Sequence, residues 1–561
     1  MVDTEPNQRF SLYTRGNVGE VFPNVISALT GTLIGDHVRQ AQVDLFVELG
    51  VLRPTEVVGP SVGTGVFGGY LYGNGSVMRL FGVRAPGMDA TAGDDQVYGA
   101  VEEMPPYEPR PGDRNLWASL LVTRSLLRML RRPDLAALDA ARADAQRWLA
   151  SMPDLAASST ADLVAWLRRT FPPRQGASMH RLLRYSMMAG GPRAILDRLL
   201  ERSGAPPGLA NRLVSGTGAV DSAQLAVRLW ALARVVREDP ELTARFDEGL
   251  EGIAERVEGT ALAAELARFL ADHGHRGTDE YELATPCWSM DPTPVYRVID
   301  RLRGADEGRD PLVAAARLRA DADTALHEAL AATPRSRRRF VRRIVTVARL
   351  GAIGRERAKD ILVLENLGAR QVLHELVRRA AVRGGTSDPR DAFCITLEEL
   401  PDYVEHPERH ALVIAERSAL RDHLDARIPP PWFQGRIPDP DTWAMKAADP
   451  RAAPRDGARL EGIAVSGGVA SGPARVIRDP RDPRGLHDGE VLVCAVTDPS
   501  WTPLFLGAAA VVCDTGAMQS HAAIVARELG IPAVMSVPGI TSIADGTVLQ
   551  VDGTNGVVTV G

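Results

Sequence analysis

Apolar residues recur at helical spacing through the middle of the chain. Successive apolar positions lie three or four residues apart, as in Leu225, Leu229, Leu232 and Val236, and again in Leu262, Leu266 and Phe269. This spacing places an apolar stripe on one face of a helix. We therefore predict that residues 114–425 are mainly helical. The first hundred residues mix helical stretches with glycine-rich turns, and their order is not evident from the pattern.

The pattern changes to short β-branched runs near the C-terminus. Turn residues separate these runs, which cover residues 474–477, 490–496, 509–513, 533–537, 548–551 and 557–560. One helix is predicted at 522–529, with Ser520 as its N-cap and Gly530 as its stop. Residues 459–561 are therefore expected to form a small α/β domain.

A proline-rich stretch separates the two patterns. Residues 428–458 contain seven prolines and little periodicity. Because proline fixes φ and removes a backbone donor, we expect an extended connector here, with Trp432, Phe433 and Trp443 able to pin it to a neighbour. The predicted domains are a mainly helical region 1–427, a hinge linker 428–458 and an α/β domain 459–561.

Composition excludes several classes of protein. A net charge of −6 over 561 residues argues against a nucleic-acid-binding protein. The two lysines, Lys359 and Lys446, lie outside any GK[ST] context, so a Walker A loop is impossible. The four cysteines form no metal-binding cluster, and no apolar run approaches the roughly 20 residues that span a bilayer. We expect a cytoplasmic protein with no membrane partner and no bound metal.

The stretch TGAMQSHAAIVARELGIPA, residues 515–533, carries the strongest chemical signal. A turn of small residues leads into a helix that begins at His521. The open N-terminus of a helix offers N–H groups and a positive dipole end to phosphate oxygens. An imidazole with a pKa of about 6.5 is largely neutral at pH 7 and is therefore nucleophilic. Ser520 is placed to cap the helix or to contact the phosphate.

This stretch resembles the phosphohistidine swivelling domain of phosphoenolpyruvate-utilising enzymes, whose motif reads roughly TxxGGxxSHxAIxARExGIPAV. Residues 462–474 and 497–503 also resemble that family, and Ala517 departs from it by replacing the second glycine. The resemblance implies a β/β/α swivelling domain and a site of Thr515, Gly516, Ser520 and His521. It further implies that His521 accepts a phosphoryl group and that the domain then swings to deliver it.

The N-terminal region resembles the helical substrate-binding domain of rifampin phosphotransferase and related split enzymes. The matching segments are Gly16–Glu20, His273–Gly277 followed by Pro286 and Trp288, Arg355-Glu356, Asp391–Phe393 and Leu397–Leu400. The resemblance implies an acceptor site near His273, His275 and Arg276, with Asn17, Glu20, Arg355 and Glu356 as substrate-binding candidates. Alternatively, the two histidines merely cap a helix that ends near His273.

The resemblance also defines the expected partners. No ATP-grasp pattern precedes the histidine domain, and the sequence ends at Gly561 without the C-terminal barrel of other family members. By analogy with phenylphosphate synthase, ATP and Mg²⁺ are expected on a separate ATP-grasp protein that acts in trans. The predicted acceptor is a hydroxyl group of a small, apolar molecule.

Three other functions remain open from the sequence. The phosphate ester could serve as a leaving group that drives dehydration or condensation of a natural-product or acyl intermediate. The chain could be a non-catalytic phosphocarrier or regulatory module. A phosphoenolpyruvate-driven protein like sugar-transport enzyme I is disfavoured because its barrel is absent from this sequence.

Overall fold

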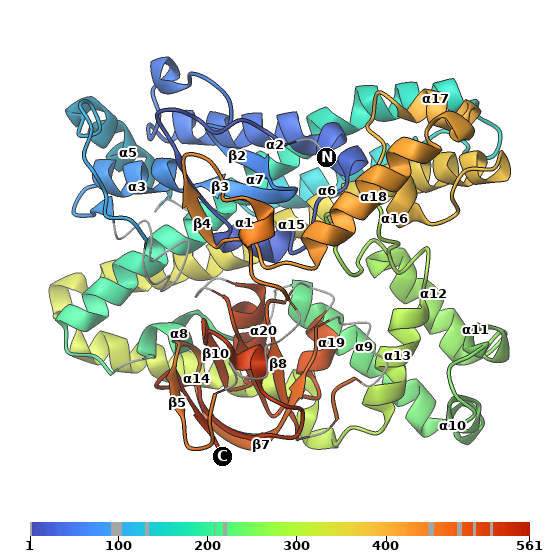
Figure 1. Ribbon diagram of the computed structural model, residues 1–561. Helices are drawn as coiled ribbons and strands as arrows, with labels where there is room; N and C mark the ends of the chain where they lie inside the picture. The colour runs from blue at the N-terminus through green and yellow to red at the C-terminus, as the bar shows by residue number, and fades with distance from the viewer. Residues whose placement is uncertain are drawn as a thin grey trace. The chain divides into compact units, whose positions relative to one another are not determined.

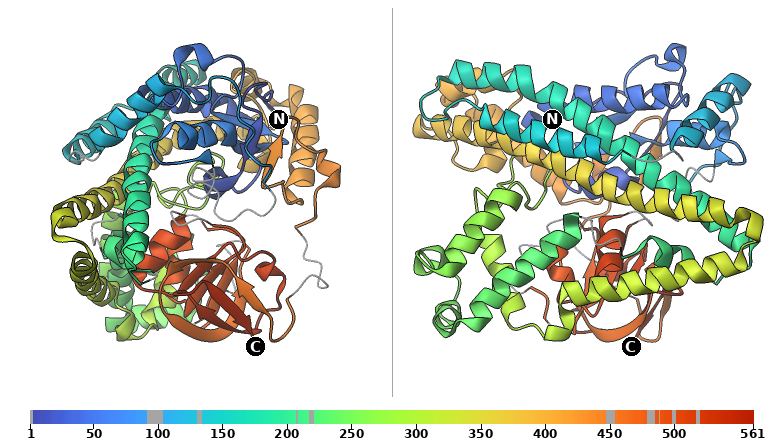
Figure 2. Two further views of the ribbon diagram at one scale, coloured as in Figure 1. Left: turned by 90° about the vertical axis from the view of Figure 1, so that its left-hand side faces the viewer. Right: turned by 180° about the vertical axis from the view of Figure 1, so that it is seen from behind.

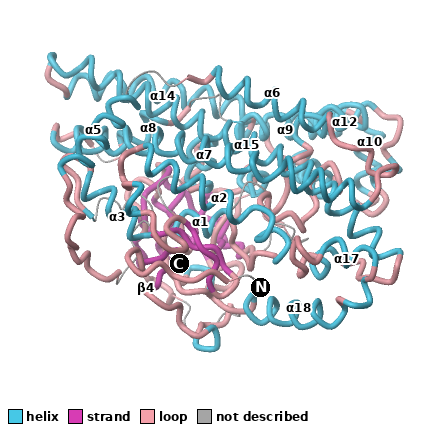
Figure 3. Tube along the Cα trace, turned by 90° about the horizontal axis from the view of Figure 1, so that it is seen from above, coloured by secondary structure: helices cyan, strands magenta, loops and turns pink. Residues whose placement is uncertain are grey.

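The computed structural model describes residues 3–90, 104–129, 134–206, 208–216, 221–446, 454–478, 485–487, 489–497, 501–516 and 520–561. Helices make up most of the traced chain (Figure 3). The chain divides into two compact units: the first holds residues 1–188, 279–285 and 358–447, and the second holds 189–278, 286–357 and 448–561. This division differs from the three domains predicted from the sequence, whose boundaries stay a prediction.

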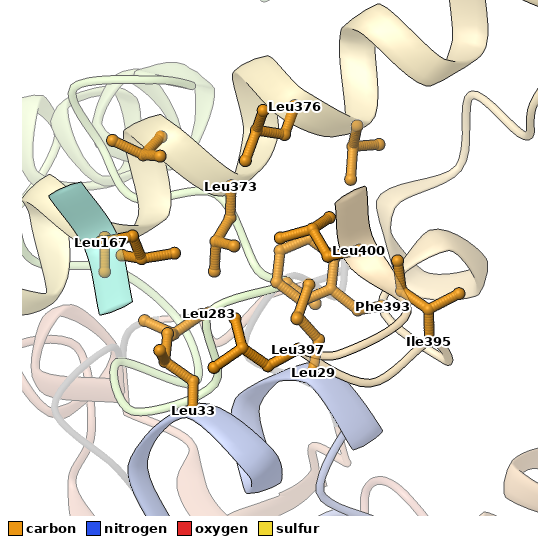
Figure 4. Packing of buried hydrophobic residues seen from close by; sticks show 14 of the residues in the cluster. Leu29, Leu33, Leu167, Leu283, Leu373, Leu376, Phe393, Ile395, Leu397 and Leu400 are labelled. Atoms are coloured by element: carbon orange, nitrogen blue, oxygen red, sulfur yellow. The ribbon is translucent and has the colours of Figure 1, made fainter. Parts of the chain in front are cut away.

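The first unit is mainly helical. Its helices are α1 (Gly16–Val21), α2 (Ala28–Glu48), α3 (Gly75–Arg84), α5 (Leu116–Met129), α6 (Ala136–Ala150), α16 (Pro389–Ala392), α17 (Leu400–Glu405), α18 (Ala411–Asp425) and the larger parts of α7 (Thr160–Arg202) and α15 (Arg338–Val382). Leucines of α2, α7 and α15 meet Leu283, Phe393 and Leu400 in one buried cluster (Figure 4). Packing of this apolar cluster, rather than local propensity, provides most of the stability of such helices.

A small antiparallel sheet joins distant parts of the first unit. Its order is β2 (Thr64–Phe67), β3 (Tyr70–Asn74), β1 (Leu12–Thr14), β4 (Trp432–Gln434) (Figure 1). Strand β4 belongs to the stretch predicted as a linker, and Phe433 and Trp443 are buried with Tyr13, Phe67 and Tyr70. The expected pinning by aromatic residues is confirmed for Phe433 and Trp443, so residues 432–443 are part of the first unit.

The second unit combines helices with a larger sheet. Its helices before the sheet are α8 (Leu209–Val214), α9 (Asp221–Glu238), α10 (Pro240–Asp247), α11 (Ile253–Arg256), α12 (Ala261–His273), α13 (Thr293–Arg303) and α14 (Pro311–Ala332). The predicted apolar stripes of α9 and α12 are confirmed, because every residue named for the two stripes is buried in one cluster. Thr260 caps α12 by accepting a hydrogen bond from the Ala263 N–H.

The C-terminal sheet contains eight strands in the order β5-β12-β11-β7-β8-β9-β10-β6. The strands are β5 (Arg459–Glu461), β6 (Ile463–Ser466), β7 (Val469–Val476), β8 (Val491–Cys494), β9 (Ala510–Cys513), β10 (Ala533–Met535), β11 (Val548–Asp552) and β12 (Val557–Val560). Strands β7, β8, β9 and β10 are parallel neighbours, and the remaining pairs are antiparallel. The sheet is strongly curved (Figure 2). The predicted α/β domain is confirmed as a mixed sheet with helices α19 (Thr502–Phe505) and α20 (His521–Leu529).

Helix α20 lies against helices that precede the sheet in the second unit. It contacts α9 and α14, and Leu506 and Leu529 join the apolar cluster of α9, α12 and α13. The side chain of Leu318 on α14 approaches Gly530, the residue that ends α20. Helix α20 is therefore covered on its C-terminal part.

Among the described residues, no helix is both long and apolar enough to cross a bilayer.

Candidate phosphohistidine site

The candidate site lies where the chain leaves β9 and enters α20. Asp514, Thr515 and Gly516 follow the buried strand Ala510–Cys513, and Ser520 precedes the helix. Residues 517–519 lie outside the described part of the chain, and with them the departure from the family motif at Ala517. Thr515 and Gly516 therefore lie just beyond the C-terminal end of β9, and Ser520 and His521 lie at the N-terminal end of α20.

Ser520 serves as the helix cap. Its hydroxyl accepts a hydrogen bond from the Ala523 N–H at 3.1 Å, and the residue is 2% exposed. Of the two roles expected for Ser520, the structure shows the capping role. His521 is the first residue of α20, and its side chain lies outside the described residues. The backbone thus places His521 at the positive end of a capped helix, where phosphate is favoured.

The loop is anchored to the neighbouring strand by Thr515. Both the N–H and the hydroxyl of Thr515 donate to the Ala495 carbonyl, each at 3.0 Å. Ala495 directly follows β8, and the Asp514 N–H donates to Cys494 at the end of the same strand. Thr515 is thus a structural anchor of the loop.

Two further residues hold the loop from the other side, and sequence reasoning missed both. The Ser536 hydroxyl donates to the Gly516 carbonyl at 2.7 Å. The Asp514 carboxylate accepts from the N–H of Thr541 at 3.2 Å and also from its hydroxyl. Burial raises the pKa of Asp514, while the hydrogen bonds from Thr541 oppose that effect. No pattern in the sequence indicates the role of Ser536. A carboxylate directly after a buried strand, however, is a signal that could have indicated Asp514.

Arg527 places a buried positive charge on the same helix. Burial is the main cause that lowers the pKa of Arg527, the charges of Arg193 and Arg355 add to it, and the resulting pKa is about 9. Its guanidinium donates to the Val465 carbonyl at 3.3 Å. Arg355, a predicted substrate-binding residue, is therefore within electrostatic range of α20, and Glu356 beside it is buried.

The segment His273–Gly277 forms a pinned, buried loop. Helix α12 ends at His273, and the centroid of the His273 ring lies 5.2 Å from that of Phe269. His275 and Arg276 are buried, at 2% and 5% exposure. The Arg276 carbonyl accepts from the Trp288 N–H at 2.8 Å, which ties the loop to a second segment. A Cβ on Gly277 would lie 3.1 Å from the Cα of Cys287, so this approach requires glycine.

The remaining predicted residues belong to the first unit. Asn17 and Glu20 lie on α1, and their side chains are outside the described residues. In the same unit, the Lys359 ammonium lies 3.7 Å from the Glu280 carboxylate and is nearly buried. Sequence reasoning did not propose Lys359 as a site residue, although its rarity in an arginine-rich chain was a usable signal.

The described residues offer no cluster of three or more His, Cys, Asp or Glu side chains that could hold a metal ion.

Comparisons with known families identify both parts of the second unit. Residues 181–356 match the rifampicin phosphotransferase fourth domain, and residues 486–556 match the mobile domain of PEP-utilising enzymes. The second match covers the loop, the capped helix and both anchoring residues, Asp514 and Ser536. The first covers His273, His275, Arg276, Arg355 and Glu356.

Full-length relatives have similar sequences over about 60% of the chain. A rifampicin phosphotransferase from Streptomyces sviceus is 30% identical over 379 residues, which are 64% of this chain and 42% of the relative. The prodigiosin synthesizing transferase PigC of Serratia marcescens is 29% identical, covering 63% and 40%. The chondramide synthase cmdD of Chondromyces crocatus is 32% identical, covering 59% and 9%. The chain therefore spans less than half of the length of each of these relatives.

Proposed function

We propose that His521 carries a phosphoryl group from ATP to a hydroxyl group of a small molecule. The chain belongs to the phosphoenolpyruvate-utilising, rifampicin phosphotransferase-like enzymes. The observation that carries the proposal is the position of His521 as the first residue of α20, after a loop held on both sides by hydrogen bonds. Such a helix start offers N–H groups and a dipole to the phosphoryl oxygens.

The transfer takes place in two in-line steps. In the first, an imidazole nitrogen of His521 forms a bond to phosphorus while the phosphorus–oxygen bond to the donor breaks. In the second, the acceptor oxygen bonds to phosphorus, the phosphorus–nitrogen bond breaks, and the hydroxyl proton passes to a base. Because the phosphohistidine divides the reaction, donor and acceptor never have to meet.

ATP and Mg²⁺ belong, in this proposal, to an ATP-grasp protein that acts in trans. The scarcity of lysine in this sequence, Lys359 and Lys446 alone, supports that arrangement. ATP supplies the phosphoryl group, and this chain supplies the nucleophile.

The acceptor is proposed to bind near the loop that follows α12. Arg276 can hold phosphoryl oxygens through its guanidinium, and His273 or His275 can accept the hydroxyl proton. Arg355, Glu356, Asn17 and Glu20 are the proposed substrate-binding residues. The match to the rifampicin phosphotransferase fourth domain, which includes residues 273–276, supports this assignment.

A second candidate function uses the same histidine. Two relatives are named for natural-product assembly, a prodigiosin synthesizing transferase and a chondramide synthase. Their names favour the alternative in which the phosphate ester is a leaving group for condensation or dehydration. A stable phosphorylated product indicates phosphotransfer, whereas an unsaturated or condensed product with free phosphate indicates the alternative. A phosphocarrier would pass the label to another protein instead.

The test of the proposal is phosphoryl incorporation from β- and γ-labelled ATP, with and without a candidate ATP-grasp protein. We expect acid-labile, base-stable label on the chain only when the partner is present. Label without the partner would show that this chain binds the nucleotide itself. Absence of label from ATP with every candidate partner would leave the non-catalytic function as the better account.

The acceptor assignment is tested with Arg276→Ala. Because Arg276 is proposed to act only in the second step, His521 phosphorylation should keep its rate while delivery to the acceptor slows about 100-fold. Arg268→Ala, which removes an exposed arginine of α12, is the matched control and should change neither step. Equal loss in both steps would contradict the assignment.

A further inference from the structure

Ser536 adopts a backbone conformation that normally belongs to glycine. Its φ is +55°, and it directly follows β10, whose three residues are fully buried. A side chain in this left-handed region is strained, and such strain persists only where the surrounding structure imposes it. The serine therefore needs an explanation beyond the turn itself, which glycine would make without strain.

The Ser536 hydroxyl provides that explanation. It donates to the Gly516 carbonyl at 2.7 Å, a normal length for a hydroxyl hydrogen bond. The next residue, Val537, donates its N–H to the Cys513 carbonyl at 3.0 Å. The chain at Ser536 thus returns to the end of β9 and contacts the loop five residues before His521.

The loop is also closely packed at Gly516. A Cβ at Gly516 would lie 3.1 Å from the Cβ of Met535, so the loop passes closely over the end of β10. On the opposite side, Thr515 is held by the Ala495 carbonyl. The first half of the loop is consequently clamped between the strand ends of β8 and β10.

We infer that Ser536 is a positioning residue for phosphoryl transfer. Its strained backbone is retained because the hydroxyl holds the Gly516 carbonyl, and with it the entry into α20. Without that bond the loop shifts relative to the strand ends, and the helix N–H groups no longer meet the phosphoryl oxygens in the required geometry. This inference rests on the proposed role of His521.

Substitutions at Ser536 separate positioning from stability. Ser536→Gly removes the hydroxyl and also relieves the strain, so its Tm should stay within about 3 °C of the wild type. Ser536→Ala removes the hydroxyl and keeps the strain, so its Tm should fall. Ser536→Thr keeps the hydroxyl but adds a β-branched side chain in the left-handed region, so it should be the least stable of the three.

The readout is the rate of His521 phosphorylation by potassium phosphoramidate, which requires no partner protein. Peptide mapping at neutral pH follows His521, with the exposed His327 as an internal standard. We expect Ser536→Gly and Ser536→Ala to slow labelling of His521 about tenfold, equivalent to one lost interaction in the transition state. Ser536→Thr should restore the rate to within about threefold despite its lower Tm, because it retains the donor.

Ser61→Gly is the matched control. Ser61 also has a positive φ, +51°, but it lies in the first unit, and its hydroxyl has no hydrogen-bond partner among the residues that the structure describes. This variant should label at the wild-type rate. Wild-type labelling in a folded Ser536→Gly would overturn the inference and leave the proposed function intact. Failure of the wild-type chain to be labelled on His521 would overturn the proposed function, and the inference with it.

Discussion

The histidine loop and the helical core of the first unit both contain hydrogen-bonded polar groups, but they assemble them differently. Around the loop, the bonded residues lie between Cys494 and Thr541, and backbone carbonyls provide several of the acceptors. In the helical core, buried side chains from α7 and α15 meet across about 190 positions: Ser178 donates to Glu365, and Gln175 donates to Asn366. The first arrangement joins residues 20 to 27 positions apart within one sheet, and the second joins helices far apart in the chain.

The difference also concerns what a single substitution disturbs. In the first unit, removal of one partner of a buried ion pair destabilises the fold, because the other charge is left unpaired in an apolar interior. At the histidine loop, hydrogen bonds fix the direction of a short segment whose neighbouring strands also pair with each other. We therefore expect substitutions in the helical unit to change stability with little effect on His521 labelling, and substitutions around the loop to do the reverse.

The largest effect on stability is expected from Glu56→Gln. Glu56 forms two hydrogen bonds with the fully buried Arg84, at 2.8 and 2.9 Å. Burial raises the pKa of Glu56, but the bonds from Arg84 and Arg53 outweigh it and hold the pKa well below its usual value. The variant leaves Arg84 without its counter-charge, so the free energy of unfolding in urea should fall by about 3–5 kcal/mol.

The control for Glu56→Gln is Glu48→Gln, which removes a half-exposed carboxylate of the same unit. Glu48 pairs with His180 and Arg184 at the surface, so its loss should cost less than about 1 kcal/mol. Both variants should label on His521 with phosphoramidate at the wild-type rate. Slower labelling of His521 in folded Glu56→Gln would contradict the expected difference between the two regions.

The next effect depends on pH and concerns His374. Burial lowers the pKa of His374 to about 4, and the ring Nε2–H donates to the Leu283 carbonyl at 3.0 Å. Above pH 6.5 the ring is neutral in both states, and pH has no effect through it. As pH falls from 6.5 to 4, only the unfolded chain gains the proton, so stability decreases by about 3 kcal/mol.

His374→Gln should abolish this part of the pH dependence, since the amide can still donate to the Leu283 carbonyl. Urea unfolding at several pH values between 7 and 4 measures it. His327→Gln, on an exposed position of α14, is the control and should keep the wild-type slope. An unchanged slope in His374→Gln would show that another group titrates in this range.

The smallest effect on stability is expected from Ser520→Ala. The loss of the cap to the Ala523 N–H should cost about 1 kcal/mol. Since the same helix end is proposed to bind the phosphoryl group, His521 labelling should also slow several-fold. Thr260→Ala removes the equivalent cap of α12 and should cost a similar free energy without slowing the labelling. Equal labelling in both variants would remove Ser520 from the site.

The sequence predicted what is encoded locally. The helix predicted after the N-cap Ser520 covers His521–Leu529 in the structure, and each predicted run from 474 to 560 overlaps a strand. The match of three motifs in order also identified the family. These features depend on side-chain periodicity, caps and turn residues that lie close together in the chain.

The features that the sequence did not predict depend on contacts between distant residues. Strand β4 pairs with β1 across 420 positions, inside a stretch that proline content indicated as a linker. Strands β5 and β6 are short, and their pairing with β12 and β10 decides their structure. The positive φ of Ser536 is imposed by its neighbours, because no local propensity favours serine in that conformation.

The most direct test of the account is to map the phosphorylated residue after exposure to ATP, Mg²⁺ and the proposed ATP-grasp partner. Tandem mass spectrometry at neutral pH preserves phosphohistidine and can compare the wild type with His521→Ala and with His327→Ala as control. The account predicts phosphate on His521 in the wild type and in His327→Ala, and none in a folded His521→Ala. Phosphorylation retained by His521→Ala, or located on another residue of the wild type, would contradict it.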